Sequence, residues 1–480
     1  MTPGTPQRPV HELGALEVAG ALARGELTSS GLVAHLLARI ERLNPGLHAI
    51  VAVHPQALEQ ARAADARRAG GAALGPLDGV PIIIKDNIEA VGLPGSVGSL
   101  AMANAPAQRD AGLVARLRAA GLVVLAAANL SEWANFRGMR STSGWSAVGG
   151  LTDNPWQPGR SAGGSSSGSG AALAAGFAPL AVGTETDGSI TCPAALCGVV
   201  GLKPTVGSVP ADGVAPISGS QDSPGPMARC VADAAALLDV LTDRPGWLAA
   251  ADERPRRYVL GAPTCWRTAD PATDALFDQV VARVRAAGAA VLPVEVPSVD
   301  DAVAADEVTV LAHEMGDDLD AYLAGRPGDG PRSTAAVVAF NAEHADAELA
   351  HFGQEYLELA AGSGGRAADE YRAARERNLA WAVDEVLVPA FAHGVDALIA
   401  PAYGPAWASR LDGGDEFTGG AVTAAPAIAG WPILTIPIGL LDGLPIGLSI
   451  VGPEHGEATV LAIGAVLEAA VGRLDPPGPG

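Results

Sequence analysis

The sequence predicts a large α/β fold, with one large, mixed, mostly parallel sheet covered by helices on both faces. A strand–helix–strand order indicates this, because a β-branched strand at 77–88 is followed by a helical segment at 110–120 and an apolar run at 121–130. Two later apolar runs, at 258–263 and 395–401, also read as buried strands. We therefore expect the chain to leave the sheet and return to it.

The remaining segments fit around these strands. Residues 1–70 form a predicted helical lead-in, and residues 77–230 hold the core strands. Residues 270–395 are predicted to be mainly helical and to shape the substrate pocket, and a hairpin is expected around Leu441-Asp442-Gly443. We expect a single domain over 1–480, with an irregular Pro/Gly-rich stretch at 206–227.

The stretch from Gly159 to Thr205 is the one around which the chain is organised. Its segment 163–170 is too rich in Gly and Ser to predict helix or strand, and it leads into a small-residue helix. Such runs are more often flexible linkers, but here apolar segments flank the run closely on both sides. A buried strand then precedes Asp187-Gly188-Ser189, where successive backbone N–H groups can converge on an oxyanion.

Charge and composition limit the possible partners. The formal net charge is −22, which disfavours binding to nucleic acid or to an anionic membrane. No apolar run approaches the roughly 18 residues that a membrane span needs. The N-terminal residues lack the pattern of a secretory signal, so a cytoplasmic location is expected. The four cysteines lack metal-ligand spacing, and neither a metal nor a cofactor is expected.

Two residue types indicate the mechanism. Of the 31 Lys and Arg residues only Lys85 and Lys203 are lysines, and only a lysine can lose its proton and act as a base. None of the nine histidines falls between residues 77 and 227. A G-x-S-x-G match would make Ser166 the nucleophile of a serine–histidine hydrolase, but the polar segment before it does not predict the required strand. Lys85 is therefore the available base.

Five stretches of the chain carry recognisable motifs: GVPIIIKDNI from Gly79, GGSSSGSG from Gly163, GTETDGSI from Gly183, CGVVGLKPT from Cys197 and SQDSPGPMAR from Ser220. These motifs resemble those of the amidase signature family, and the resemblance covers nearly the whole chain. Within the family, NLSEWANFRG, SGWSAVGG and GTETDGSI are most similar to the peptide amidases, which act on C-terminal carboxamides of peptides.

The resemblance implies a Ser-Ser-Lys triad. It makes Ser189 the nucleophile, Ser165 the bridging serine after a cis peptide bond and Lys85 the base. The implied oxyanion hole consists of the backbone N–H groups of Thr186, Asp187, Gly188 and Ser189. Ser141 matches a serine that the family places beside the lysine, and Lys203 matches a position without a catalytic role.

The chain departs from the commoner family wording at Glu185, Asp187 and Thr191. These changes favour the peptide amidases over the tRNA-dependent amidotransferase subunits. Asp187 either orients a substrate N–H or caps a turn. We expect hydrolysis of C-terminal peptide or amino-acid amides by a monomer or homodimer. The alternatives are a general aryl or aliphatic amidase, a glutamine amidotransferase subunit, or, least favoured, an inactive binding module.

Overall fold

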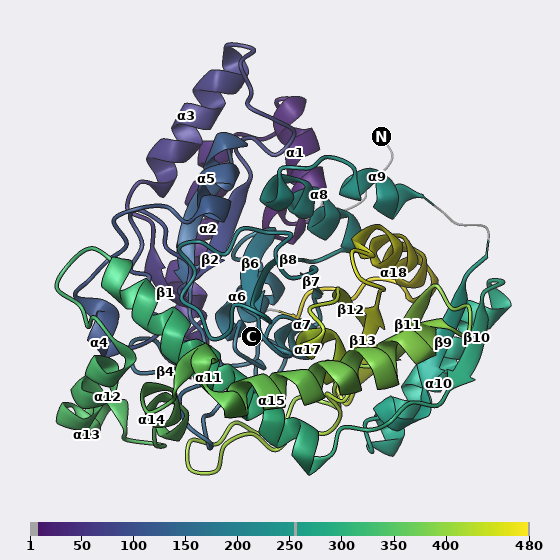
Figure 1. The fold of residues 1–480 in the computed structure, drawn as a ribbon. Coiled ribbons are helices and arrows are strands. Elements are labelled where there is room, and N and C mark those ends of the chain that lie inside the picture. Colours follow the sequence, from purple (N-terminus) through teal and green to yellow (C-terminus); the bar gives the residue numbers. More distant parts are fainter. Residues whose placement is uncertain (1–7, 254–256, 479–480) are drawn as a thin grey trace.

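The protein is described by a computed structural model for residues 8–253 and 257–478, so the first seven residues of the predicted lead-in, residues 254–256 and residues 479–480 lie outside the described residues. Within this part of the chain, eleven strands form one sheet in the order β1-β3-β2-β6-β8-β7-β12-β13-β11-β9-β10 (Figure 1). The strands are β1 (Ile50–Val53), β2 (Pro81–Lys85), β3 (Val123–Ala128), β6 (Leu180–Glu185), β7 (Val200–Lys203), β8 (Ser223–Ala228), β9 (Val259–Pro263), β10 (Ala290–Val294), β11 (Ala397–Pro401), β12 (Ile433–Leu441) and β13 (Leu444–Val451). A separate small ribbon pairs β4 (Trp145–Ser146) with β5 (Gly150–Leu151).

The sheet is mixed, as predicted. Parallel pairs join β3, β2 and β6 in one block and β11, β9 and β10 in another. Between these blocks the pairs from β6 through β8, β7, β12 and β13 to β11 are antiparallel. This centre adds antiparallel pairing to the mostly parallel arrangement that the strand–helix–strand order predicts, because β8 and the β12–β13 hairpin enter the sheet there.

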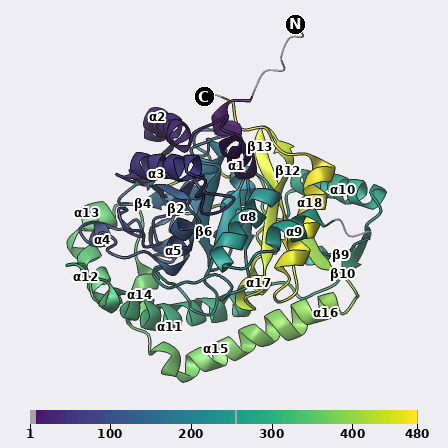
Figure 2. The ribbon, with the colours of Figure 1, turned by 90° about the horizontal axis from the view of Figure 1, so that it is seen from above.

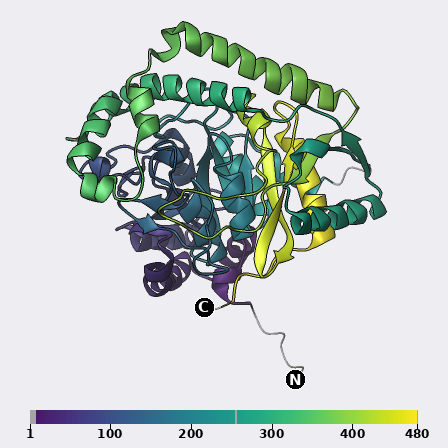
Figure 3. The ribbon, with the colours of Figure 1, turned by 90° about the horizontal axis from the view of Figure 1, so that it is seen from below.

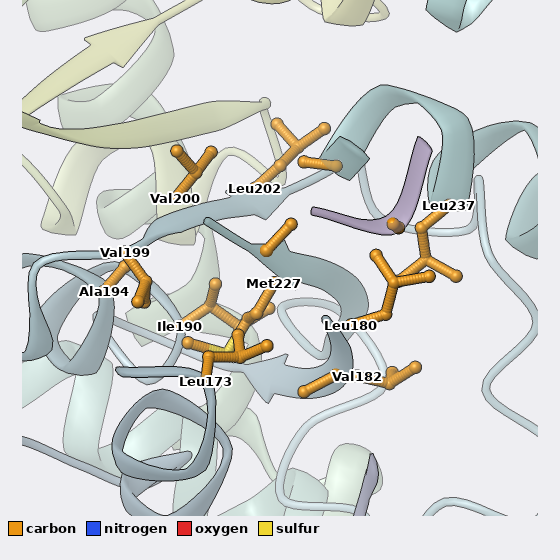
Figure 4. Packing of buried hydrophobic residues seen from close by; sticks show 14 of the residues in the cluster. Leu173, Leu180, Val182, Ile190, Ala194, Val199, Val200, Leu202, Met227 and Leu237 are labelled. Atoms are coloured by element: carbon orange, nitrogen blue, oxygen red, sulfur yellow. The ribbon is translucent and has the colours of Figure 1, made fainter. Parts of the chain in front are cut away.

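Helices cover both faces of the sheet: α8 and α18 lie over β8 and β12 on one side (Figure 2), and α6 and α7 pack against the other side. Apolar side chains such as Leu173, Ile190, Met227 and Leu237 fill the space between these helices and β6–β8 (Figure 4). The helices of the first half are α1 (Ala15–Ala23), α2 (Ser29–Leu47), α3 (Ala57–Ala69), α4 (Leu100–Ala103), α5 (Gly112–Ala119), α6 (Ser167–Ala174), α7 (Thr191–Cys197), α8 (Val231–Thr242) and α9 (Trp247–Asp252), with the 3-10 turns η1 (Val10–Glu12) and η2 (Glu132–Asn135).

The segment between β9 and β11 is mainly helical, as predicted, and its long helices run along one edge of the molecule, with α15 outside α11 (Figure 3). The later helices are α10 (Pro271–Ala286), α11 (Asp301–Gly325), α12 (Thr334–Glu343), α13 (Ala345–Glu348), α14 (Glu355–Ala361), α15 (Asp369–Leu379), α16 (Val388–Phe391), α17 (Ala424–Ile428) and α18 (Glu457–Val471), with the short helices η3 (Thr264–Trp266), η4 (Gly365–Ala367) and η5 (Ala380–Leu387). Among the described residues, no helix combines the length and apolar character that a membrane crossing requires.

Two local predictions were wrong, and two segments that were predicted to be mainly helical also contain a short strand. The stretch 163–170 is not all loop, because α6 begins at Ser167 and its first turn is fully buried. Glycine is required there, since a Cβ on Gly168 would come within 2.5 Å of the carbonyl oxygen of Asn129. The irregular stretch 206–227 contains most of β8, whose prolines and glycine conceal its strand character. The helical lead-in contains β1, and the helical segment 270–395 contains β10; both are short strands at the edges of the sheet.

Candidate active site

Two parallel strands bring the lysine and the serine loops together. Lys85 is the last residue of β2, and β6 runs parallel beside it with Ile84 opposite Val182. The carboxyl ends of adjacent parallel strands lie at the same edge of a sheet, where polar side chains from the following loops can meet. The loop that carries Ser189 leaves β6 at Glu185, and therefore starts next to Lys85.

The Lys85 side chain is fully buried and faces two residues. Its Nζ lies 2.7 Å from Ser165 Oγ, 2.8 Å from Thr184 Oγ1 and 3.2 Å from the Thr184 carbonyl oxygen. Asn87 Nδ2 donates to the same Thr184 hydroxyl at 3.0 Å. A neutral amine has two hydrogens and one lone pair. If Thr184 accepts both hydrogens, the lone pair points at the Ser165 hydroxyl and can take its proton.

The electrostatic surroundings favour the neutral form of this lysine. Burial lowers the pKa of Lys85 to about 7, although the carboxylates of Asp222 and Glu185 act in the opposite direction. Burial raises the pKa of Asp222 to about 6, while hydrogen bonds from Thr186 and from the 217–218 backbone lower it. Near neutral pH a large fraction of Lys85 is therefore unprotonated and can act as a base.

Ser165 follows a cis peptide bond from Gly164, as the resemblance implies. Its carbonyl oxygen accepts from the backbone N–H of Ser131 at 3.1 Å, and the next residue, Ser166, donates its backbone N–H to the carbonyl oxygen of Ser189 at 3.0 Å. The Ser/Gly loop and the Ser189 loop are therefore directly bonded. Among the described residues no hydrogen bond joins the Ser165 and Ser189 hydroxyls, so the backbone brings the two serines together.

The loop before α7 presents free backbone donors. Within the described chain, no acceptor takes a hydrogen bond from the backbone N–H groups of residues 186–189. The next two N–H groups, of Ile190 and Thr191, both donate to Glu185 Oε2, at 2.7 and 2.8 Å. Gly188 has φ +78°, and a Cβ there would lie 2.7 Å from Tyr403 Oη. The loop therefore needs this glycine, and its free N–H groups can bind an oxyanion.

A cavity of about 430 Å³ opens onto this loop. Ser189 is 7% exposed and lines the cavity, so its hydroxyl is accessible only from within it. The volume is in the range of small-molecule sites. The walls come from the 134–136 turn, from α11 and from the 403–424 segment, which carries Tyr403, Trp407 and Phe417. The cavity is therefore bounded by segments that lie far apart in the sequence.

The remaining predicted residues have other partners. The Ser141 hydroxyl forms a turn with Gly138, donating to its carbonyl oxygen at 2.8 Å, whereas Lys85 is bonded to Ser165 and Thr184. Lys203 is fully buried, and its Nζ donates to the Pro204 carbonyl oxygen at 3.3 Å. Across residues 8–253 and 257–478, no three His, Cys, Asp or Glu side chains are grouped so that they could hold a metal ion.

Two groups at this site were not predicted from the sequence. Thr184 lies inside the GTETDGSI motif, and its position one residue before the end of a buried strand was a signal that could have marked it as a partner of Lys85. Glu307, on α11, lines the cavity from the mainly helical segment 270–395, hereafter the helical insertion, where no motif was found. Only the fold brings Glu307 close to the loop that carries Ser189.

The fold and the site together define an α/β protein with a buried lysine–serine pair beside a cavity. The family model described as Amidase matches residues 31–461, and the chain belongs to this amidase family.

Similar proteins include amidases and amidotransferase subunits. A glutamyl-tRNA(Gln) amidotransferase subunit of Salinispora arenicola is 35% identical over 97% of this chain and 98% of its own. A probable amidase of Arabidopsis thaliana is 34% identical over 94% of this chain and 88% of its own. The crystal structure of the peptide amidase from Stenotrophomonas maltophilia has a TM-score of 0.91 and 42% identity, covering 98% of this chain and 99% of its own.

Proposed function

We propose that the protein is an amidohydrolase that converts a carboxamide to a carboxylate and ammonia through an acyl-enzyme on Ser189. The observation that carries this proposal is the buried pair of Lys85 Nζ and Ser165 Oγ, 2.7 Å apart, beside a cavity that exposes Ser189 and unpaired backbone donors. A nucleophile, a base and an oxyanion site are the groups that acyl transfer requires.

The proposed reaction begins when Ser189 Oγ attacks the amide carbonyl carbon. The Ser189 proton passes to Ser165 Oγ, and the Ser165 proton passes to neutral Lys85. The N–H groups of residues 186–189 bind the oxyanion. When the C–N bond breaks, the leaving nitrogen takes a proton from Ser165, which Lys85 replenishes, and ammonia departs. Water then attacks the ester, gives one proton to the same relay, and Ser189 leaves reprotonated.

The substrate class in this proposal is the C-terminal carboxamide of a peptide or amino acid. Its support is the similarity to the peptide amidase at 42% identity over nearly the full length of both chains. The cavity volume and the nearby backbone donors also suit an extended polar acyl group. Internal peptide bonds are expected to survive, because a chain that continues past the scissile bond would meet the wall around Lys85 and Ser165.

One alternative has support of its own, and a second shares the proposed chemistry. The similarity at 35% identity to a glutamyl-tRNA(Gln) amidotransferase subunit favours a protein that passes ammonia to a partner. Such a subunit requires its complex for transfer, whereas a hydrolase releases ammonia alone. A general aryl or aliphatic amidase would share the same catalytic groups but would prefer small amides.

The test incubates the purified chain alone with an amidated peptide, the same peptide with a free carboxylate, glutamine and a set of small aryl amides. Ammonia is measured, and mass spectrometry identifies the peptide products. We expect ammonia release from the amidated peptide, replacement of its NH2 by OH and no shorter fragments. Internal cleavage would contradict the proposed pocket. Turnover of aryl amides alone would favour the general amidase, and turnover of glutamine alone would favour the amidotransferase subunit.

A further inference from the structure

The cavity that exposes Ser189 is acidic. Three carboxyl side chains line it, those of Asp187, Glu307 and Asp415, and no Lys, Arg or His from the described part of the chain does so. The three come from different regions: Asp187 from the loop that carries Ser189, Glu307 from α11 and Asp415 from the 403–424 segment. Arg375 and Lys203 act on Glu307 and Asp187 from outside the lining, so within the cavity the carboxyl groups favour a ligand that carries positive charge.

Asp415 already has hydrogen-bond donors. Its carboxylate oxygens each lie 3.2 Å from the backbone nitrogen of Ser143, and Oδ1 accepts from Trp407 Nε1 at 3.0 Å. These bonds connect the 403–424 segment to the loop before the Ser/Gly stretch. Asp415 therefore has a structural use that explains its burial, and we assign it to the cavity wall.

Asp187 is less fully bonded, because the Thr423 hydroxyl that lowers the pKa of its carboxyl also donates to the Gly420 carbonyl oxygen. Asp187 Oδ1 is shielded from solvent and has no hydrogen-bond partner among the described residues. A carboxylate that caps this turn would accept hydrogen bonds from the backbone N–H groups of Ile190 and Thr191. Both groups donate to Glu185 instead. The sequence leaves two roles open for Asp187, and one of them, capping the turn, is therefore performed by Glu185. The carboxyl group of Asp187, which lines the cavity, therefore keeps hydrogen-bonding capacity that the described residues do not use.

Glu307 is held against the same cavity by the core of the protein. Gln221 Nε2, on a fully buried side chain of the SQDSPGPMAR stretch, donates to Glu307 Oε1 at 2.9 Å. Burial raises the pKa of both Asp187 and Glu307, and the Asp187 charge raises that of Glu307 further. The two carboxyls are therefore close enough to repel each other, and a cation between them would remove this repulsion.

We propose that Asp187 and Glu307 form a subsite that binds a cationic group, an ammonium or a guanidinium, on the acyl part of the substrate. This inference rests on the proposed function, because it takes the amide carbonyl of the substrate to lie at Ser189. Asp187 is two residues from Ser189, so the bound cation lies near that carbonyl. The aromatic residues Tyr403, Trp407 and Phe417 line the same cavity and are suited to contact a cation.

Two substrate pairs separate the possible sources of the charge. N-acetyl-arginine amide and N-acetyl-citrulline amide differ in the side-chain charge at nearly constant shape. Leucine amide and N-acetyl-leucine amide differ in the α-ammonium group. We expect kcat/KM for ammonia release to favour the cationic member of at least one pair by about tenfold or more. In Asp187→Asn and in Glu307→Gln that ratio should fall towards one.

The matched control is Asp301→Asn, which removes one negative charge from an exposed position on the same helix as Glu307. It should retain the wild-type ratio, because Asp301 does not line the cavity. A loss of preference in this control as large as that in Glu307→Gln would attribute the effect to net charge and overturn the subsite.

Calorimetric binding of the same four amides to Ser189→Ala tests the subsite without turnover. We expect the cationic amide of the preferred pair to bind more tightly, and Glu307→Gln added to that background to remove the difference. If wild-type protein releases ammonia from no amide but cationic selectivity in binding persists, the proposed hydrolysis fails and the subsite stands. If the neutral members bind and react as well as the cationic ones, the subsite is overturned whether or not hydrolysis is observed.

Discussion

The backbone N–H of Ser166 donates to the carbonyl oxygen of Ser189 at 3.0 Å, and this bond joins the two serine loops. It involves no hydroxyl group. The relative positions of Ser165 and Ser189 are therefore set by the main chain and by the buried first turn of α6. Substitutions that remove only a hydroxyl should leave this arrangement in place, so their effects can be interpreted chemically.

The first prediction concerns the triad. Ser189→Ala should abolish ammonia release, because no acyl-enzyme can form. Lys85→Ala should reduce kcat by several orders of magnitude, and Ser165→Ala by somewhat less, since water can replace the bridging hydroxyl. Initial rates measured alongside far-UV circular dichroism separate loss of chemistry from loss of fold.

Single substitution of each of the nine histidines provides the control for this mechanism. None lies between residues 77 and 227, where the proposed catalytic groups are found. Every histidine variant should retain measurable activity. A histidine variant as inactive as Ser189→Ala would rule out lysine as the base.

Much of this site could be predicted from the sequence. Lys85 and Ser189 lie at or shortly after the ends of β2 and β6. An apolar strand followed by polar residues can be recognised in the sequence alone. The helical start of α6 could not be predicted in the same way. Its Gly and Ser residues have low helix propensity, and only close packing against the Asn129 backbone explains them.

The second prediction is the pH dependence of kcat/KM with a neutral substrate. Lys85 accepts a proton only when it is neutral, and burial lowers its pKa to about 7. Activity should therefore be level above about pH 7 and fall by about tenfold per pH unit below it. Constant activity down to about pH 5, or an increase on acidification, would show that an unprotonated Lys85 is not required.

The third prediction tests Thr184 as a residue that positions Lys85. Thr184→Val removes the hydroxyl 2.8 Å from Lys85 Nζ and keeps the side-chain shape. The lost bond stabilises the ammonium more than the amine, so the acidic limb of the pH profile should move to lower pH. The plateau value of kcat should fall by about tenfold, because Lys85 is less well oriented.

Thr273→Val is the matched control for this substitution. Thr273 is buried on α10, and its hydroxyl has no hydrogen-bond partner among the described residues. It should change neither the limb nor the plateau. If Thr184→Val lowers the plateau and leaves the limb in place, Thr184 supports the fold and does not hold Lys85.

The fourth prediction concerns stability. Arg137 is fully buried, with its Nη1 2.9 Å from Glu132 and 3.7 Å from Glu348, and it packs against Phe352. Arg137→Met would leave two buried carboxylates without their countercharge. The free energy of unfolding in urea should fall by about 3–5 kcal/mol.

Arg372→Met provides the comparison, because Arg372 forms an exposed pair with Asp369 on α15. Its removal should change the free energy of unfolding by less than about 1 kcal/mol. Equal effects of the two substitutions would show that the buried contacts of Arg137 with Glu132 and Glu348 do not stabilise the packing of α13 against the core.

The helical insertion was the least predictable part of the chain. Its helical character follows from periodicity, but Glu307 carries no sequence signal that distinguishes it from neighbouring acidic residues such as Asp306. Asp306 pairs with Arg377, whereas Glu307 turns to Gln221 and the cavity. The difference comes from how α11 is rotated against the core, which depends on contacts between distant segments.

The acyl-enzyme proposed for Ser189 can be trapped and identified. The protein is mixed with an amidated or esterified peptide, quenched in acid within the first turnover, and analysed by intact-mass and peptide-level mass spectrometry. We predict an added mass equal to the acyl group, located on Ser189 and absent from Ser189→Ala. An acyl group on Ser165, Ser166 or a cysteine, with Ser189 unmodified and turnover intact in Ser189→Ala, would contradict the account.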